Sequence, residues 1–336
     1  MGAQTPRVSS ARTLIGLDAV EAAARDIAGH VVRTPTVASA GLSALLGAPV
    51  TAKLELLQRT GSFKARGATA KLLALTAAQR TAGVVAVSGG NHAIAVADTA
   101  AALGIAATVV MPESASSSTV AACRATGANV RLTPDIAAAF ALVDELRAVG
   151  LTLVHPFDDP LVLAAQGTVG LELAEDAGEL TDVLVSVGGG GLVGGVATAL
   201  RALRPGVRIW GVETVGAEAM SAALAAGAPQ RVPLSSIVVS LSAPSVSELT
   251  LAHVQALVHE LLVVTDAEAV RGTLELAAHG KVWAEPAAGC LLPAARLVLQ
   301  RHPDARLGLV VCGGNATVAD VVAWAARFGV GLSGRT

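Results

Sequence analysis

Short apolar segments alternate with helical segments along most of the chain, and this alternation constrains the fold more than any other feature. The apolar segments are 50–54, 84–87, 107–111, 130–132, 151–154, 183–187, 207–212, 261–264 and 307–312. Segments with helical periodicity separate them, chiefly 65–75, 93–103, 116–125, 136–149, 161–175, 192–203, 218–226, 287–300 and 318–328. Uninterrupted apolar strands between helices are typical of parallel sheets that helices cover on both faces. An α/β protein is therefore predicted, with a second lobe starting near residue 160.

Composition excludes several classes of protein. The 336 residues are enough for two lobes, and only 15% of them are charged, with a net charge of −2 and no basic run for nucleic acid. The uncharged segment 183–200 contains six glycines that divide it into strand, loop and helix, so we expect no membrane span. Residues 1–7 lack the apolar region of a secretory signal. The three cysteines have no metal-binding spacing, and their odd number fits a reduced cytoplasm.

Lys64 lies where a turn becomes a helix, in the stretch 60–68 (TGSFKARGA). Gly61 allows a tight turn and Ser62 is a favourable helix N-cap, so Lys64 is expected in the first helical turn. The helix dipole and burial both disfavour the ammonium and lower its pKa. A neutral amine is a nucleophile that forms a Schiff base with an aldehyde. An isolated lysine of this kind is more often a helix surface residue, so other loops must decide between the two interpretations.

Four consecutive glycines, 188–191, follow a predicted strand and open a helix. Their exposed N–H groups beside a helix N-terminus indicate a phosphate site. The loop also contains the spacing G-x-G-x-x-G, ending at Gly194, and Glu213 follows the next strand about twenty residues on, as a dinucleotide site requires. A dinucleotide-dependent oxidoreductase therefore stays open as an alternative.

Other polar loops also follow predicted strands. Ser88–His92 (SGGNH) offers a hydroxyl, an amide and free N–H groups, which suit a carboxylate or a phenolic oxygen. Cys312 begins the loop CGGN, and Glu285 precedes a helix that it could simply cap. His92 and His155 could act as bases, although each alone is more often structural. Ligands of parallel sheets bind at the carboxyl ends of strands, which is where these loops fall.

Taken together, the loops resemble the pyridoxal-phosphate enzymes of fold type II, specifically the serine/threonine dehydratase family. Residues 53–68 (KLELLQRTGSFKARGA) are similar to the cofactor-lysine signature of the family. The resemblance continues, in the family's order, through 88–92, 154–159, 166–168, 188–191 and 312–315. It implies two open, twisted, mostly parallel sheets with flanking helices and pyridoxal 5'-phosphate between the lobes. The implied domains are a large one, 1–78 and 156–336, and a small one, 79–155.

The resemblance also implies a role for each matching residue. Cofactor contacts fall on Lys64, Phe63, Asn91, Gly188, Gly189, Gly190, Gly191, Leu192, Cys312 and Glu285. Substrate contacts fall on Ser88, Gly89, Asn91, His92, Val239 and Ser240. Lys64 would form the Schiff base and take the Cα proton, with Ser62 close to the reacting centre. Asn91 would contact the phenolic oxygen of the cofactor, and Cys312 the pyridine nitrogen.

The implied activity is removal of water from a β-hydroxy amino acid such as threonine or serine, giving a 2-keto acid and ammonia. Gly89 stands where racemases of the family carry a serine, so racemisation is not expected as the main activity. Glu213 matches one cation ligand of relatives, but Ala219 replaces an expected carboxylate, so no metal is predicted. The apolar Val239 loop could admit a larger substituent, as in phenylserine.

Two further interpretations stay open beside this one. A non-catalytic small-molecule-binding protein on the same fold would leave an intact Lys64 unexplained. The oxidoreductase alternative would leave both the Lys64 stretch and the Cys312 loop unexplained. The predicted partners are an amino-acid substrate and further copies of the chain, as a dimer or tetramer. The predicted location is cytoplasmic.

Overall fold

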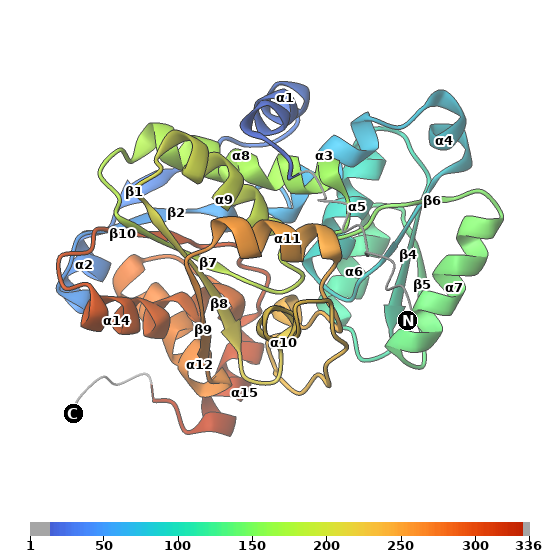
Figure 1. The fold of residues 1–336 in the computed structure, drawn as a ribbon. Helices are drawn as coiled ribbons and strands as arrows, with labels where there is room; N and C mark the ends of the chain where they lie inside the picture. Colours follow the sequence, from blue (N-terminus) through green and yellow to red (C-terminus); the bar gives the residue numbers. More distant parts are fainter. Residues whose placement is uncertain (1–13, 332–336) are drawn as a thin grey trace, which may run out of the picture.

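The computed structural model describes residues 14–331 and contains two separate sheets (Figure 1). The larger sheet has the order β1-β2-β10-β7-β8-β9 and is parallel except for the antiparallel pair β1–β2. Its strands are β1 (Thr36–Ala38), β2 (Val50–Lys53), β7 (Asp182–Ser186), β8 (Arg208–Thr214), β9 (Glu260–Val264) and β10 (Leu307–Val310). The prediction of residues 1–7 lies outside the described residues.

The smaller sheet is parallel throughout, in the order β5-β4-β3-β6. Its strands are β3 (Val84–Val87), β4 (Ala107–Pro112), β5 (Asn129–Thr133) and β6 (Thr152–Leu153). The prediction of two mostly parallel sheets with flanking helices is confirmed. Parallel strands buried on both faces need apolar residues at every position, which explains why β3 and β10 have no exposed residue.

Helices cover both sheets. The first half of the chain contributes α1 (Leu17–Ile27), α2 (Ala40–Leu46), α3 (Lys64–Leu73), α4 (Ala77–Ala82), α5 (Asn91–Ala102), α6 (Ser117–Ala125) and α7 (Ile136–Ala148). The second half contributes α8 (Pro160–Asp176), α9 (Gly191–Leu203), α10 (Ala219–Ala226), α11 (Glu248–Leu257), α12 (Asp266–Glu275), α13 (Pro286–Gly289), α14 (Leu291–Arg301) and α15 (Val318–Phe328). Short 3₁₀ segments, η1 (Glu55–Leu57) and η2 (Val239–Leu241), and a π-helical turn, η3 (Leu276–Gly280), complete the chain.

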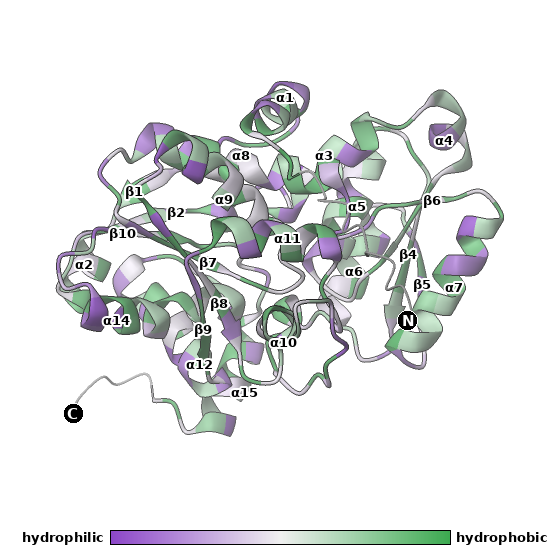
Figure 2. Cartoon of the chain, viewed as in Figure 1, coloured by the Kyte–Doolittle hydropathy of each residue, from purple (hydrophilic) through white to green (hydrophobic). Residues whose placement is uncertain are grey.

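Hydropathy follows the layers of the fold. Figure 2 shows apolar strands at the centre of each sheet, with polar residues mixed into the outer helices. The largest core cluster joins β7, β8 and β10 to α9 and α14. None of the helices in the described part of the chain combines the length and the apolar character needed to cross a membrane.

The order of the strands positions the predicted loops. Strands β2, β10 and β7 are adjacent and parallel, and they lead into the Lys64 turn, the Cys312 loop and the 188–191 glycine loop. Because parallel strands present their carboxyl ends at one edge, these three loops meet there. Helix α3 links the two halves, since its Ala68 and Leu72 belong to the core cluster of the smaller sheet.

Two local predictions are wrong. Ser62 does not cap α3, because the N-cap is Phe63 and Ser62 instead forms an isolated antiparallel bridge with Gly313. The single helix predicted at 287–300 is broken into α13 and α14 at Cys290. This break lies beside the close approach of Gly289 to α12, where a Cβ at Gly289 would overlap Ala269. Tertiary contacts override local helix propensity in both places.

Candidate active site

Lys64 is the first residue of α3, as predicted, and it follows a turn in which Gly61 has φ +72°. Its Nζ donates a hydrogen bond of 3.0 Å to the carbonyl of Pro156 and lies 5.0 Å from the centre of the Phe63 ring. Burial lowers the pKa of Lys64 to about 8, although the nearby Cys312 and Glu285 act in the opposite direction. The amine is therefore partly neutral near physiological pH, as a nucleophile requires.

The loop after β10 lies directly against the Lys64 turn. The Phe63 amide donates to the Cys312 carbonyl at 3.1 Å, and the Gly314 amide donates to the Gly61 carbonyl at 2.9 Å. Together with the bridge between Ser62 and Gly313, these bonds hold two segments about 250 residues apart in sequence as one short ladder. Lys64 and Cys312 are thereby brought into one site.

Cys312 is buried among polar partners. Its Sγ lies 3.9 Å from Ser186 Oγ, and Cys290 Sγ lies 3.7 Å from the same hydroxyl. Burial raises the pKa of the Cys312 thiol well above its usual value, and the carboxylate of Glu285 adds to the effect. The thiol is therefore protonated and neutral throughout the physiological range.

Asn91 is the first residue of α5 and is buried. Its Nδ2 donates to Oε1 of Glu285 at 2.8 Å. Burial raises the pKa of Glu285, while hydrogen bonds from Asn91 and from the side chain of Ser240 oppose that shift. Asn91, Glu285 and Ser240, which come from three distant segments, thus form one polar group next to Lys64.

The glycine loop 188–191 is confined on several sides. A Cβ at Gly189 would overlap the Phe157 ring, and one at Gly190 would approach Met220 and Thr250. Gly190 has φ +89° and is the N-cap of α9. The loop amides therefore lie at the N-terminus of α9, together with the free amides of its first turn. Such a cradle of N–H groups at a helix N-terminus binds phosphate.

These residues fit the predicted cofactor. Its aldehyde, phosphate, phenolic oxygen and ring nitrogen would meet the Lys64 amine, the glycine-loop amides, the Asn91 amide and the Cys312 thiol, respectively. Ser62 Oγ and Thr60 Oγ1 are buried and have no hydrogen-bond partner among residues 14–331. Buried polar atoms without partners are costly, and a bound polar group would satisfy them.

The predicted substrate loop follows β3. Ser88 Oγ accepts a hydrogen bond of 3.2 Å from the Gly90 amide, and a Cβ at Gly89 would lie 3.2 Å from Ala115 Cβ. His92 Nε2 is 2.8 Å from the carbonyl of Val154. Burial lowers the pKa of His92 to about 3, and Lys64 contributes to the shift. His92 is therefore neutral and structurally engaged, rather than a free base.

Two predicted residues stand apart from this cluster. The Leu192 side chain is buried in the main core, so only its backbone amide is available to a ligand. The Val239 side chain, in η2, is 68% exposed and therefore faces solvent more than it faces the buried polar group around Asn91.

Sequence reasoning missed three residues of the site. These are Pro156, whose carbonyl holds Lys64, Phe157, which lines the glycine loop, and Asn315, which contacts Asn91. The motifs 154–159 and 312–315 were the only sequence signals for them, and neither motif indicates which atom makes the contact.

Glu213 is not available to a dinucleotide. Its Oε1 accepts the Met220 amide at 2.8 Å, and its Oε2 accepts the Ser221 amide and hydroxyl. Both oxygens are therefore occupied by hydrogen bonds from the first turn of α10, and the residue is fully buried. Burial raises the pKa of Glu213 despite these bonds. Among residues 14–331, no group of three histidine, cysteine or acidic side chains is placed to bind a metal.

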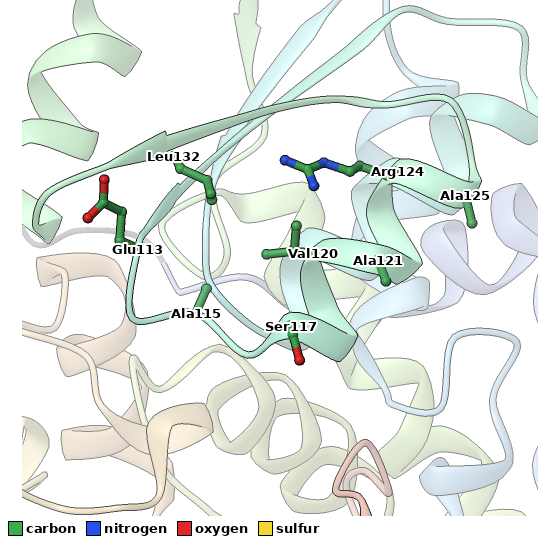
Figure 3. A pocket seen from close by; sticks show the side chains of 8 residues that line it. All are labelled: Glu113, Ala115, Ser117, Val120, Ala121, Arg124, Ala125 and Leu132. Atoms are coloured by element: carbon green, nitrogen blue, oxygen red, sulfur yellow. The ribbon is translucent and has the colours of Figure 1, made fainter.

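An open cavity of about 710 Å³ lies elsewhere, between α6 and β5 (Figure 3). Its lining consists of Glu113, Ala115, Ser117, Val120, Ala121, Arg124, Ala125 and Leu132. None of the predicted site residues lines it, although Ala115 in its lining lies beside Gly89 of the predicted substrate loop.

Comparison with known proteins identifies the family. The sequence model of the family described as pyridoxal-phosphate dependent enzyme matches residues 27–313. The chain is 38% identical over 310 residues to L-threonine ammonia-lyase of Thermotoga maritima, covering 91% of this chain and 77% of that protein. It is also 38% identical over 324 residues to phenylserine dehydratase of Ralstonia pickettii, covering 95% of this chain and 98% of that protein.

Solved structures agree. Maize serine racemase superposes with a TM-score of 0.87 at 32% identity, covering 94% of this chain and 98% of that chain. The threonine deaminase of T.th. superposes with a TM-score of 0.81 at 38% identity, covering 90% of this chain and 99% of that chain. The predictions of a pyridoxal-phosphate-dependent lyase and of pyridoxal 5'-phosphate as its cofactor are confirmed. The chain belongs to the fold type II pyridoxal-phosphate-dependent enzymes of the serine/threonine dehydratase family.

Proposed function

We propose that the protein removes water from a β-hydroxy-α-amino acid and releases a 2-keto acid and ammonia. Threonine and serine are the first proposed substrates, and an aryl-serine such as phenylserine is the alternative. One observation carries the proposal. The Lys64 amine forms no ion pair within residues 14–331, bonds only to a carbonyl, and has a pKa lowered to about 8 by burial. Such an amine can both bond to the cofactor and accept a proton.

When bound, pyridoxal 5'-phosphate withdraws electrons from the Cα of an amino acid. In the proposal, Lys64 removes the Cα proton and holds it on Nζ, and the β-hydroxyl takes up a proton delivered near the phosphate and leaves as water. The amides of 188–191 bind the phosphate, and Asn91 contacts the phenolic oxygen. Cys312 faces the ring nitrogen as a neutral thiol, because burial raises its pKa. A neutral thiol does not protonate that nitrogen as a carboxylic acid would, which favours prompt elimination.

The substrate carboxylate is assigned to the loop after β3. Free amides at the start of α5 and the hydroxyl of Ser88 suit an anion. His92 would be held neutral behind this loop, since burial lowers its pKa to about 3. Ser62, whose buried hydroxyl has no partner in the described part of the chain, would lie beside the reacting atoms.

Elimination is favoured over racemisation by the residue at position 89. Racemisation needs a second proton carrier on the face of Cα opposite Lys64. Gly89 supplies no side chain there, and the space beside it is bounded by Ala115. Serine racemase of maize is nevertheless similar to this chain, so the two activities must be measured together.

The size of the accepted substituent is assigned to η2. Ser240 bonds to Glu285 and so supports this assignment, and the adjacent Val239 is the 68% exposed residue of the segment. An apolar side chain at this position suits a phenyl group better than a hydroxyethyl group. The similarity to phenylserine dehydratase, which extends over 98% of that protein, supports the alternative substrate.

A single preparation tests the proposal. The purified protein should be yellow, and borohydride should bleach it and leave the cofactor covalently attached to Lys64. Threonine, serine and phenylserine should each be assayed for keto acid, ammonia and loss of optical activity. A colourless protein that binds NAD, or racemisation faster than ammonia release, would contradict the proposal.

Substitution of the η2 segment separates the two substrate classes. Val239→Ser should lower the ratio of phenylserine to threonine turnover. Val263→Ser, at another exposed valine in β9, serves as the control that should leave the ratio unchanged. An unchanged ratio in Val239→Ser would remove this segment from the specificity argument.

Three further statements belong to the proposal. The chain forms a dimer or tetramer and is cytoplasmic, where its three free, buried cysteines stay reduced. Light scattering and cell fractionation test these two points. The domains comprise 1–78 with 156–336, and 79–155, a division that limited proteolysis tests.

A further inference from the structure

A short chain of amide hydrogen bonds joins the loop after β10 to the start of α5. Nδ2 of Asn315 donates to the Thr60 carbonyl at 2.8 Å and to Oδ1 of Asn91 at 2.7 Å. Nδ2 of Asn91 in turn donates to Oε1 of Glu285 at 2.8 Å. The two asparagines are 224 residues apart in sequence, and neither bond follows from a local motif.

The Thr60 carbonyl determines which atom donates in each of these hydrogen bonds. A backbone carbonyl can only accept, so the Asn315 atom that contacts it must be the NH₂ group. The Asn91 atom that receives the second hydrogen of this group must then be its carbonyl oxygen. The NH₂ group of Asn91 consequently points the other way, toward the carboxylate of Glu285. Reversing Asn91 would place its oxygen against another acceptor and its NH₂ against a donor.

One hydrogen of the Asn91 NH₂ group is left over. The first hydrogen is used by Glu285, and no other acceptor in residues 14–331 bonds to Nδ2. Asn91 is 7% exposed, so this N–H is held inside the site rather than offered to bulk water. Gly61 supports the arrangement, because a Cβ there would overlap the Asn315 side chain.

We propose that Asn315 is a positioning residue that makes Asn91 present an N–H, and not its carbonyl oxygen, to the phenolic oxygen of the cofactor. The inference rests on the proposed function, in which Asn91 contacts that oxygen. A donor at this oxygen stabilises its negative charge, and most of all when the neighbouring lysine linkage loses its proton. Asn315 thereby lowers the pH at which the yellow cofactor–lysine chromophore deprotonates.

The test is a double-mutant cycle on the loaded enzyme, with the pH midpoint of the chromophore as its readout. Asn315→Ala, Asn91→Ala and the double variant are titrated by absorbance. Each single variant should raise the midpoint, by about 0.3–1 pH unit for the loss of one hydrogen bond. The double variant should match Asn91→Ala alone, because Asn315 acts through Asn91.

Asn315→Asp is the sharper second variant. Asn315 is exposed, so neither change is expected to unfold the protein, and the melting temperature checks this. An aspartate cannot donate to Asn91, so the bond that holds the Asn91 oxygen in place is lost, and its carboxylate favours the reversed amide, in which the NH₂ group turns away from the cofactor. The midpoint should rise at least as far as in Asn315→Ala. Ala316→Asp, which adds the same charge one residue away, should cause a smaller rise.

The outcomes separate the inference from the proposed function. If Asn91→Ala shifts the midpoint and the Asn315 variants do not, or if the two shifts add, the inference is wrong and the proposed function stands. If the wild-type protein forms no chromophore with pyridoxal 5'-phosphate, the proposed function itself is wrong.

Discussion

Lys64 and Arg66 lie two residues apart in the first turn of α3, yet their surroundings are opposite. Arg66 is fully buried and donates to the carboxylates of Glu55 and Glu172 at 2.6–2.9 Å. Although burial lowers it, these two carboxylates raise the pKa of Arg66 above its usual value. Within residues 14–331, the Lys64 amine hydrogen-bonds only to the Pro156 carbonyl, and burial lowers its pKa.

Arg66 belongs to a buried network of ion pairs in which every charge has a partner. Lys53 joins it through Glu172 and the Thr34 carbonyl, so two cations face two carboxylates. This network connects β2, η1, α3 and α8. A buried charge whose partners are complete stabilises one conformation and does no chemistry, whereas an incompletely paired one stays reactive. The same helix thus provides both the anchor and the reactive group.

Replacing Lys64 should have the largest effect. Lys64→Ala removes both the cofactor bond and the proton acceptor, so elimination should slow by about 10³-fold or more. Keto-acid release and the loss of the borohydride-fixed cofactor are the measurements. Lys71→Ala, at the other end of α3, is the matched control and should retain most activity. Comparable loss in both variants would contradict the special role of Lys64.

Replacing Arg66 should lower the stability of the protein rather than remove a catalytic group. Arg66→Ala leaves the buried carboxylate of Glu55 without its cation and Glu172 with Lys53 alone, and the free energy of unfolding should fall by about 3–5 kcal/mol. Denaturant unfolding measures this. Arg59→Ala removes a half-exposed pair with Asp98 and should cost only about 0.2–1 kcal/mol. An equal cost for the two variants would show that the buried network is not an anchor.

The glycine cradle should tolerate no side chain. In Gly189→Ala the new Cβ would overlap Phe157, and the displaced loop should bind pyridoxal 5'-phosphate about tenfold or more weakly. Gly206→Ala, where a Cβ meets nothing within 4 Å, is the control. Cofactor titration by fluorescence measures both affinities. An unchanged affinity in Gly189→Ala would show that the phosphate does not bind at this loop.

Capture of the cofactor should depend on pH through Lys64. With a pKa of about 8, the neutral amine increases as pH rises through that value. The capture rate in cofactor-free protein should therefore rise roughly tenfold between about pH 7 and pH 9. Because the folded-state pKa lies below the ordinary lysine value of 10.5, the unfolded chain binds more protons between about pH 8 and pH 10.5. Stability contributed by Lys64 should accordingly rise with pH over this window.

Removing the unpaired hydroxyl should have the smallest effect on stability. Ser62 Oγ has no partner in the described part of the chain, so Ser62→Ala should change the free energy of unfolding of the cofactor-free protein by less than about 0.5 kcal/mol. Its elimination rate should nevertheless fall. Ser247→Ala, which removes an N-cap of α11, should cost about 1 kcal/mol instead.

The class of fold and the chemical groups of the site could be predicted from local stretches of sequence. Apolar runs such as 84–87 can be buried only in parallel sheets covered on both faces, and this property is local to each strand. Gly61 and Lys64 were also recognisable, because a positive φ and a helix start depend on neighbouring residues. The helix α11 and the strand β1 were missed, since neither carries a clear periodic or apolar signal.

Which of these groups meet depends on how the strands are ordered and how the two sheets pack. Insertion of β10 between β2 and β7 places Cys312 beside Lys64, although nothing local in the sequence encodes that pairing. The same holds for Asn315, whose bonds to Thr60 and Asn91 span more than 200 residues each. Conversely, the local sequence predicted Ser62 as a helix cap, but Ser62 forms the bridge with Gly313 instead. Hydrogen-bond partners are chosen by the packing of whole sheets, and local sequence patterns do not contain that information.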